Sequence, residues 1–318
     1  DQAVVEVRTD LENEGWEQKN AYIFTEIKDA AGEVVTSNQA PVTAFPGETT
    51  TVRQRVSVSN PELWSIDEPN LYYCYSKVIL GDEVIDEAQN QFGIRKLQLD
   101  TEKGLRINGE TINLRGACIH HDNGVVGACT FKRAEERRVE LLKEAGFNAI
   151  RSAHHPISKD LLDACDRLGM LVMDETFDMW NQNKTDYDYA QYFQEWWEKD
   201  VAAMVHKDYN HPCVLMYSIG NEILEAGTKK GARQGRKIAE KIRSLDETRY
   251  VINCVNGFLN VLDQLDEIMQ DISKSETDKK DKKDTESEIQ GEDKDKERNK
   301  EINKGNQEVS KENKENKE

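Results

Sequence analysis

An apolar run that ends in Gly-Asn-Glu is the segment whose residue types best suit chemistry. The run covers residues 214–219, and Gly220, Asn221 and Glu222 follow it directly. In parallel α/β folds the reacting groups lie at the carboxyl ends of the strands. A carboxyl group beside an amide at such a place can hold a proton for a leaving group. An acidic residue there also commonly interacts with the N-terminal dipole of the next helix, so both interpretations of Glu222 stay open at this point.

Three further clusters of ionisable residues also follow apolar runs. They contain His120, then Arg151 and His154, and finally Asp174 with Glu175. Arginine and histidine at a strand end can orient sugar hydroxyls or a carboxylate. The two acidic residues suit either a second carboxylate or a hydrogen-bond network, and a hydrogen-bonded structural histidine is the plainer interpretation of the others. Four successive strand ends with ionisable side chains are nevertheless typical of a shared catalytic face.

Aromatic residues in the same region can stack on sugar rings. Trp180 follows the third apolar run and is a candidate for such stacking, whereas Trp196 and Trp197 lie in a predicted helix, where core packing is the commoner role. The His-His-Asp run at 120–122 could bind a metal ion. Adjacent side chains on a strand point to opposite faces, however, so the spacing predicts no metal ligands.

The apolar pattern predicts that alternating strands and helices position these residues. The predicted strands cover residues 113–119, 148–152, 170–174, 214–219 and 250–253. Amphipathic helices are predicted between them, at 132–145, 158–168, 192–207 and 230–245. Such alternation favours a parallel sheet. Five strands fit either an open sheet or a (β/α)8 barrel that stops short, because a closed barrel of this type needs eight.

The first part of the chain shows a different pattern. β-branched and aromatic residues fill short runs at 4–7, 22–27, 50–58 and 71–80, and turn residues separate them. These features predict an immunoglobulin-like β-sandwich over residues 1–92. The Asn108-Gly109 pair that follows predicts a type I′ hairpin turn. The sandwich would thus precede a barrel domain at 93–272.

The last part of the chain differs from both domains. Residues 273–318 contain 13 basic and 15 acidic residues and no aromatic residue. A segment of this composition cannot bury enough apolar surface to offset the entropy of ordering it. We therefore predict a disordered, charged tail at 273–318.

Composition excludes several classes of function. The chain has 318 residues and a formal net charge of −18. Nucleic acids and membranes are not expected partners, because phosphate binding needs clustered Lys and Arg and no apolar run is long enough for a transmembrane helix. The six cysteines show no CxxC pairing, which favours reduced thiols. Together with the lack of a signal segment, this favours a cytoplasmic location.

Two motifs resemble the signatures of glycoside hydrolase family 2, the family of bacterial β-galactosidases and β-glucuronidases. The second of them covers residues 208–222 and ends at Glu222, with Tyr209 and Tyr217 as departures. In the first, at 148–172, His155 stands where Tyr is usual. The first motif carries Asn148, Arg151, Ser152, His154, Pro156, Asp166 and Gly169 at the expected spacing. The segment 92–95 and the Asn108-Gly109 hairpin also match, so the resemblance covers about residues 1–270.

The resemblance implies an architecture and an activity. Family members have a jelly roll, an immunoglobulin-like sandwich and a (β/α)8 barrel, so we expect a fragment without the jelly roll and with the barrel cut after about five strands. The run 174–180 is similar to the β-galactosidase-like branch. The expected activity is retaining hydrolysis of terminal β-D-galactosides, with Glu222 as the general acid/base.

The resemblance also assigns the ligands of the site. Asn221 would bind the 2-hydroxyl of the sugar, and the residues lining the sugar subsite would be His154, Arg151, His120 and Asp174. The expected partner is a carbohydrate substrate, and the resemblance allows a homo-oligomer. Mg²⁺ is the cofactor that the resemblance allows near Glu222, with His120 as a second contributor.

Three alternatives remain at this stage. The specificity could be that of a β-glucuronidase or of another family 2 β-glycosidase. The retaining mechanism needs a second carboxylate, and no strand that could carry it is predicted after residue 253. The fragment is therefore expected to be inactive unless Glu175 or Glu225 serves as the nucleophile. The chain could also be a non-catalytic pseudo-enzyme or an interaction fragment.

Overall fold

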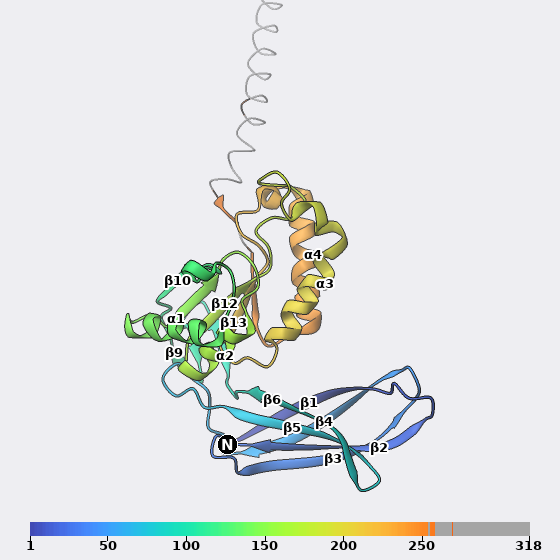
Figure 1. Ribbon diagram of the computed structural model, residues 1–318. Coiled ribbons are helices and arrows are strands. Elements are labelled where there is room, and N and C mark those ends of the chain that lie inside the picture. Colours follow the sequence, from blue (N-terminus) through green and yellow to red (C-terminus); the bar gives the residue numbers. More distant parts are fainter. Residues whose placement is uncertain (254, 258–268, 270–318) are drawn as a thin grey trace, which may run out of the picture. The chain divides into compact units, whose positions relative to one another are not determined.

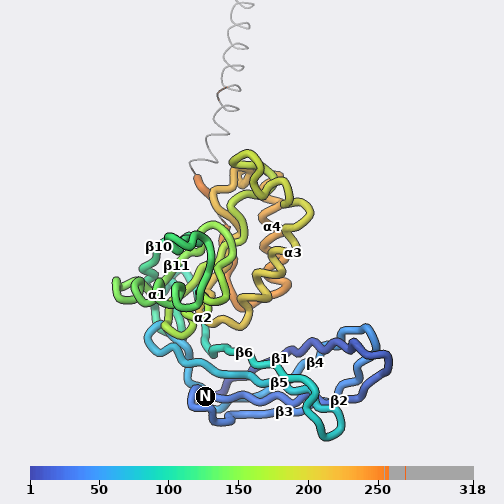
Figure 2. Tube along the Cα trace, viewed as in Figure 1, coloured from blue at the N-terminus to red at the C-terminus, as the bar shows by residue number. Residues whose placement is uncertain are grey.

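A computed structural model describes residues 1–253, 255–257 and 269 of the chain. The predicted tail at 273–318 lies outside these described residues, as does most of the segment that precedes it. Along the chain, antiparallel strands come first and alternating strands and helices follow, as the colouring by residue number shows (Figures 1 and 2).

The first domain is an antiparallel β-sandwich. Its strands are β1 (Gln2–Glu12), β2 (Lys19–Lys28), β3 (Val34–Ala44), β4 (Thr49–Ser59), β5 (Tyr72–Leu80) and β6 (Glu83–Phe92). β1 pairs with β4, and the other four form a sheet in the order β3-β2-β5-β6. Ile27, Val56, Val58 and Tyr72 pack together between the two sheets. This packing confirms the predicted sandwich.

A three-stranded hairpin sheet follows the sandwich. It consists of β7 (Leu97–Asp100), β8 (Gly104–Ile107) and β9 (Glu110–Thr111). Asn108 and Gly109 join β8 to β9 with φ angles of 54° and 91°. Both angles are positive, as a type I′ turn requires, so the predicted hairpin turn is confirmed.

The second domain is built on a five-stranded parallel sheet. The strands β10 (Gly116–Ile119), β11 (Ala149–Ser152), β12 (Leu171–Glu175), β13 (Val214–Ser218) and β14 (Tyr250–Ile252) lie in that order. The helices are α1 (Lys132–Glu144), α2 (Lys159–Leu168), α3 (Ala190–Asp208) and α4 (Lys229–Leu245), with short 3₁₀ turns at Gly124–Val126 and Leu224–Gly227. α3 and α4 lie side by side (Figure 1). The predicted βα alternation and parallel sheet are confirmed.

The ends of α2 follow from local sequence. The Ser158 side chain accepts a hydrogen bond from the Leu161 amide at 3.2 Å and caps the N-terminus. Gly169 ends the helix in the left-handed conformation, with φ of 72°. A Cβ atom at Gly169 would lie 2.3 Å from the Ile66 carbonyl oxygen, so only glycine allows this close approach.

The loop between β4 and β5 joins the core of the second domain. Trp64 is fully buried in the same apolar cluster as Leu162 and Met170. Its indole Nε1 donates a hydrogen bond to the Asp166 carbonyl oxygen at 2.8 Å. Lys143 of α1 donates to the Ile66 carbonyl oxygen at 3.0 Å. The two domains therefore share a buried anchor.

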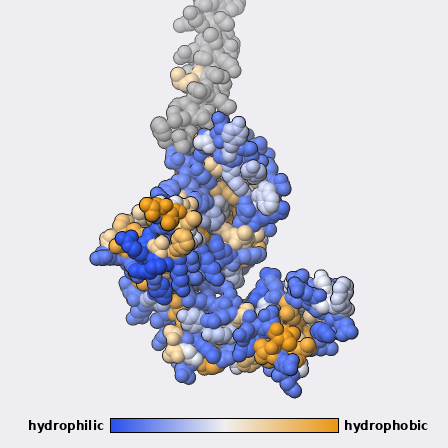
Figure 3. Space-filling model, viewed as in Figure 1, coloured by the Kyte–Doolittle hydropathy of each residue, from blue (hydrophilic) through white to orange (hydrophobic). Residues whose placement is uncertain are grey.

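On the face that Figure 3 shows, the described residues are largely hydrophilic, and apolar side chains gather in a few places. Large exposed apolar residues include Tyr22, Val84 and Ile85 in the sandwich and Val125 and Phe131 after β10. No helix within the described ranges combines the length and the apolar character needed to cross a membrane.

Candidate active site

Two loops that leave the sheet side by side bring the site together. β12 ends at Glu175 and β13 at Ser218. Beyond these ends the backbones stay paired, because the Thr176 amide donates to the Ser218 carbonyl oxygen at 3.0 Å and the Asn221 amide donates to the Phe177 carbonyl oxygen at 2.9 Å. The residues after β12 and β13 are thus held against each other at the carboxyl ends of the strands.

A buried carboxylate ties together the ends of three strands. Glu175 is fully buried, and its Oε2 accepts hydrogen bonds from Arg151 Nη2 at 2.6 Å and from the Ser218 hydroxyl at 2.7 Å. Its Oε1 lies 2.9 Å from His154 Nδ1. Burial lowers the pKa of Arg151, but the hydrogen bond and charge of Glu175 more than offset this, so the pKa of Arg151 is raised. The guanidinium is therefore a fixed positive charge.

The amide of Asn221 is fixed at both of its polar atoms. Its Oδ1 accepts a hydrogen bond from Arg151 Nη2 at 2.9 Å, and its Nδ2 donates to Asp178 Oδ1 at 2.8 Å. An amide nitrogen carries two hydrogens and an amide oxygen two lone pairs. Asn221 therefore keeps one donor and one acceptor position for a ligand.

Glu222 follows with an exposed side chain. Its φ angle is 43°, a left-handed conformation that is uncommon for a residue other than glycine. Asn256 Nδ2 donates a hydrogen bond to Glu222 Oε1 at 3.1 Å. The carboxyl group thus leaves the end of β13 toward solvent, where it can transfer a proton.

An ion pair between Lys184 and Asp178 contacts Asn221. Lys184 Nζ is 2.6 Å from Asp178 Oδ1 and donates to the Asn221 carbonyl oxygen at 2.9 Å. Burial raises the pKa of Asp178, but its hydrogen bonds from Lys184 and Asn221 lower it further, so the net pKa is below the ordinary value. Asp178 is therefore ionised at neutral pH.

Two of the predicted sugar-lining residues lie inside the protein instead. Asp174 is fully buried and accepts hydrogen bonds from the Ile157 amide at 2.9 Å and from Lys207 Nζ at 3.1 Å. Trp180 is also fully buried, and its Nε1 donates to the Ile219 carbonyl oxygen at 2.9 Å. Neither side chain can touch a sugar. The prediction that Asp174 and Trp180 are ligand residues is therefore corrected. Both side chains instead hold neighbouring segments in place through these hydrogen bonds.

The four histidines near β10 and β11 form two ring pairs. His120, which is exposed, meets His154 edge to face with ring centroids 5.2 Å apart. His121 stacks on His155 at 4.4 Å. Burial is the main cause that lowers the pKa of both His121 and His155, and for His155 it outweighs the charge of Asp174, which raises the pKa. His154, whose side chain is 26% exposed, and Arg151 both bind Glu175, so the ring pair of His120 and His154 lies next to Arg151. A role of these residues in lining a sugar site stays a prediction.

Glu225, proposed above as a possible nucleophile, is used structurally. It is buried, and its Oε1 accepts hydrogen bonds from the amides of Asn181 at 2.8 Å and Gln182 at 3.2 Å. Glu175 is bound just as firmly by the network described above. Neither carboxylate is free to attack a substrate.

The surroundings of Glu222 do not fit the Mg²⁺ ion that the resemblance allows. The nearby acceptor atoms, Asp178 Oδ1 and the Asn221 carbonyl oxygen, are already bound by the ammonium group of Lys184. A divalent cation there would meet a positive charge at close range. Within the described part of the chain, the residues spaced to hold a metal are Asp163, Asp166 and His211. They lie at the opposite end of β13, next to Cys213.

The sequence patterns assign no role to Asp178 and Lys184. The signal that could have identified Asp178 is its position, because it follows the end of β12 at the same interval as Asn221 follows the end of β13. Lys184 lies in an irregular loop, where no periodic pattern points to its partner. Only the pairing of the two loops brings these residues to Asn221.

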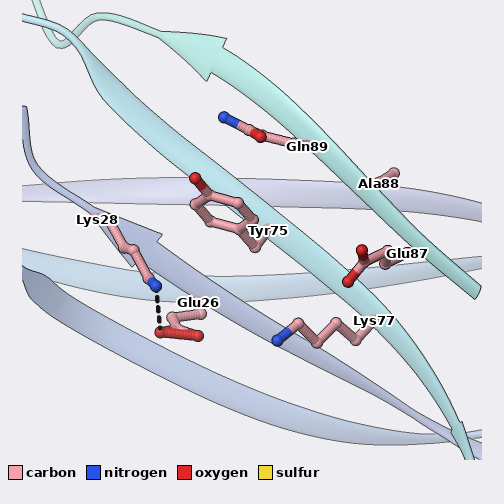
Figure 4. A pocket seen from close by; sticks show the side chains of 7 residues that line it. All are labelled: Glu26, Lys28, Tyr75, Lys77, Glu87, Ala88 and Gln89. Carbon is pink, nitrogen blue, oxygen red and sulfur yellow. Dashed lines mark ion pairs between the residues drawn. The ribbon is translucent and has the colours of Figure 1, made fainter. Parts of the chain in front are cut away.

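A hollow of about 320 Å³ lies on the sandwich, on the sheet face formed by β2, β5 and β6 (Figure 4). Lys28 Nζ lies 3.4 Å from Glu26 Oε1 and 5.0 Å from the centre of the Tyr75 ring. The charges of Lys28 and Glu26 neutralise each other. Residues of the sandwich alone line this hollow, so the strand ends of the second domain remain the candidate site. Its lining residues are Glu26, Lys28, Tyr75, Lys77, Glu87, Ala88 and Gln89.

Comparisons with known proteins agree with this architecture. Residues 1–95 match the protein-family model described as "Glycosyl hydrolases family 2", and residues 99–305 match "Glycosyl hydrolases family 2, TIM barrel domain". A beta-galactosidase of Bacteroides ovatus is 43% identical over 224 residues, which cover 70% of this chain and 26% of that protein. A putative beta-glucuronidase of Formosa agariphila is 41% identical over 169 residues, covering 53% of this chain and 16% of that protein.

A solved structure shows the same fold. The crystal structure of a glycosyl hydrolase family 2 member from Bacteroides cellulosilyticus superposes with a TM-score of 0.78 at 45% identity. The match covers 81% of this chain and 33% of that one. The chain therefore spans only a third or less of the length of these relatives, from 33% of the Bacteroides cellulosilyticus chain to 16% of the Formosa agariphila protein.

Proposed function

The chain belongs to glycosyl hydrolases family 2, and from that premise we propose that it carries the acid/base half of a retaining β-glycosidase active site. Glu222 is the general acid/base in this proposal. The observation that carries it is the exposed carboxyl group of Glu222 beside an amide, Asn221, that Arg151 and Asp178 hold in place. The proposed sugar-binding residues are Asn221, Arg151, His154 and His120.

Retaining hydrolysis assigns two tasks to two carboxyl groups. One protonates the leaving oxygen and later removes a proton from water, while the other attacks the anomeric carbon. Glu222 suits the first task because it is exposed at the strand ends. Glu175 and Glu225 are buried and hydrogen-bonded. We infer that the described residues supply the acid/base without the nucleophile, and that the 318-residue chain is inactive alone.

The proposed substrates are terminal β-D-galactosides. The run 174–180 and the relative named a beta-galactosidase, at 43% identity, support this specificity. A second candidate is a β-glucuronide, because a relative named a putative beta-glucuronidase is 41% identical. A panel of aryl β-glycosides separates the two. A non-catalytic pseudo-enzyme is the remaining alternative.

Chemical rescue tests the proposal on the chain itself. Sodium azide supplies an external nucleophile for a folded sample that contains phenyl β-D-galactoside, whose strongly basic phenolate leaving group needs a proton. An azide nitrogen bonds to the anomeric carbon, the glycosidic C–O bond breaks, and the departing phenolate takes a proton from Glu222. We expect phenol release only with azide, and a loss of about 100-fold or more in Glu222→Gln.

A surface substitution, Glu83→Gln, is the matched control and should keep the azide-dependent rate. Release that persists in Glu222→Gln, or no release from folded wild-type chain with any glycoside of the panel, would contradict the acid/base assignment. Turnover without azide would refute only the missing nucleophile and would require a second carboxylate within the chain.

A further inference from the structure

Asp178 and Asn221 together form a polar pair that is complementary to a hydroxyl group. Asn221 Nδ2 gives one hydrogen to Asp178 Oδ1 at 2.8 Å and keeps a second one. Asp178 Oδ2 accepts no hydrogen bond from any described residue, and the side chain is 38% exposed. A hydroxyl both donates and accepts. The free oxygen and the free amide hydrogen therefore suit the two roles of one hydroxyl.

The pair is held rigidly by Lys184. Its ammonium group binds Asp178 Oδ1 at 2.6 Å and the Asn221 carbonyl oxygen at 2.9 Å, so a single side chain fixes both partners. The lysine itself is anchored, because its backbone amide donates to Asp188 Oδ2 at 2.7 Å. Residues that are fixed before a ligand arrives lose little entropy when it binds. The arrangement thus has the rigidity of a binding site.

The charge of the pair also suits a hydroxyl ligand. Asp178 is ionised at neutral pH, because its hydrogen bonds from Lys184 and Asn221 lower its pKa more than burial raises it. A hydrogen bond from a hydroxyl to a carboxylate is stronger than one between neutral groups. A negatively charged sugar substituent would instead be repelled at this oxygen.

We propose that Asp178 is a substrate-binding residue whose Oδ2 accepts a hydrogen bond from the sugar 2-hydroxyl, the same hydroxyl that Asn221 binds. This inference rests on the proposed function, in which Asn221 binds the sugar, and on the contact with the 2-hydroxyl that the family resemblance implies for Asn221. Lys184 is the positioning residue of the pair. The site selects sugars with a free equatorial 2-hydroxyl, such as galactosides, and excludes 2-acetamido sugars, which place a bulky group there.

The proposed hydrogen bond between the 2-hydroxyl and Asp178 affects the reaction rate as well as the binding of the sugar. The 2-hydroxyl lies next to the carbon on which positive charge develops, and hydrogen bonds to it strengthen in the transition state. A sugar without this hydroxyl leaves Asp178 and Asn221 without a partner. A site built to bind a hydroxyl discriminates strongly against the analogue that lacks it.

A binding experiment on the 318-residue chain tests the inference without the need for turnover. Calorimetric titration compares methyl β-D-galactopyranoside with its 2-deoxy analogue. We expect the wild-type chain to bind the parent sugar at least about tenfold more tightly than the analogue. In Asp178→Asn the ratio should fall below about threefold, because affinity for the parent is lost and affinity for the analogue is kept.

Two further variants complete the test. Asp186→Asn, an exposed residue of the same loop, should keep the wild-type ratio. Lys184→Met should lower the ratio while Asp178 is still present, which covers the case in which Asp178→Asn fails to fold. Circular dichroism reports on folding for each variant.

The outcomes separate the inference from the proposed function. If Asp178→Asn weakens both sugars equally or neither of them, the role of Asp178 is structural at most and the inference is overturned, although the sugar site stands. If folded wild-type chain binds neither sugar, the proposed function fails at this face and the inference fails with it.

Discussion

At the scale of single residues, the buried carboxylate of Glu175 organises the site. It binds Arg151 from β11, His154 from the segment after β11, and Ser218 from β13. Through Arg151 it also fixes the amide of Asn221. The groups that would touch a sugar are therefore positioned by a residue that no sugar can reach.

Replacement of Glu175 by Gln should destabilise the protein. The glutamine cannot supply the negative charge that balances Arg151, and breaking a buried ion pair from one side costs about 3 kcal/mol. Urea unfolding at pH 7, followed by circular dichroism, measures the difference in the free energy of unfolding. The exposed substitution Glu83→Gln should change it by less than about 0.5 kcal/mol. Equal stability of the two variants would show that the network contributes little.

Sequence predicted part of this site and missed part of it. Glu222, Asn221, Arg151, His154 and His120 could be proposed as site residues because each lies at or just after the end of a predicted strand, where polar groups collect. Whether a side chain is buried could not be predicted from the sequence in the same way. The carboxyl group of Asp174 and the indole of Trp180 turn into the core, and that direction depends on neighbours such as Lys207 that are distant in sequence.

At the scale of elements, the helices and parallel strands were predicted closely, whereas the sandwich was not predicted in full. β3 and β6 were missed. β3 contains a polar stretch of Thr, Ser, Asn and Gln, and eight of the ten residues of β6 are exposed. Strands at the edges of a sheet need no apolar face of their own. Their pairing with β2 and β5 defines them, and a single-sequence pattern does not show such pairing.

The contact between the end of α3 and β12 should make stability depend on pH. Asp208 ends α3 and is fully buried, and burial, followed by the nearby charge of Asp174, raises its pKa more than Lys207 lowers it. A group with a raised folded pKa stabilises the fold below its unfolded pKa, about 3.9 for Asp, and loses this contribution as the pH rises through the folded pKa. Asp208→Asn should therefore gain stability relative to wild type between pH 4 and pH 8.

Thermal unfolding at a series of pH values measures this gain, which we expect to be roughly 2–4 °C in melting temperature. Asp246→Asn is the control with the opposite sign. Burial raises the pKa of Asp246, but Arg249 and Thr248 lower it further. A lowered folded pKa stabilises the fold above about pH 4, so this variant should lose stability relative to wild type as the pH rises. The same trend in both variants would contradict the assignment.

At the scale of the whole molecule, the sandwich and the barrel domain are joined through Trp64. The residue lies in a loop of the sandwich, yet its side chain is fully buried in the core of the second domain and bonded to Asp166. Gly93 adds a second close approach, because a Cβ atom there would lie 2.7 Å from the Pro212 ring. We infer that the two domains stabilise each other.

Replacement of Trp64 should make the sandwich and the barrel domain unfold in two separate transitions. Truncation of a buried Trp to Ala costs about 3–5 kcal/mol, and in Trp64→Ala the loss falls on the contact between the domains. Differential scanning calorimetry should show one transition for the wild-type chain and two for the variant. Trp16→Ala, at a side chain that is 97% exposed, should keep the single transition. Two transitions in the wild type would show that the domains were never coupled.

The strands of the parallel sheet lie in the same order as they occur in the chain, from β10 to β14. During synthesis on the ribosome, each new strand can therefore add to the edge that the previous one has just formed, without waiting for a distant partner. N-terminal parts of a chain generally fold first as they emerge. All the hydrogen-bond partners of Glu175 have been synthesised once β13 has left the exit tunnel. The network that positions the residues beside Glu222 can therefore form while the residues after Glu222 are still being translated.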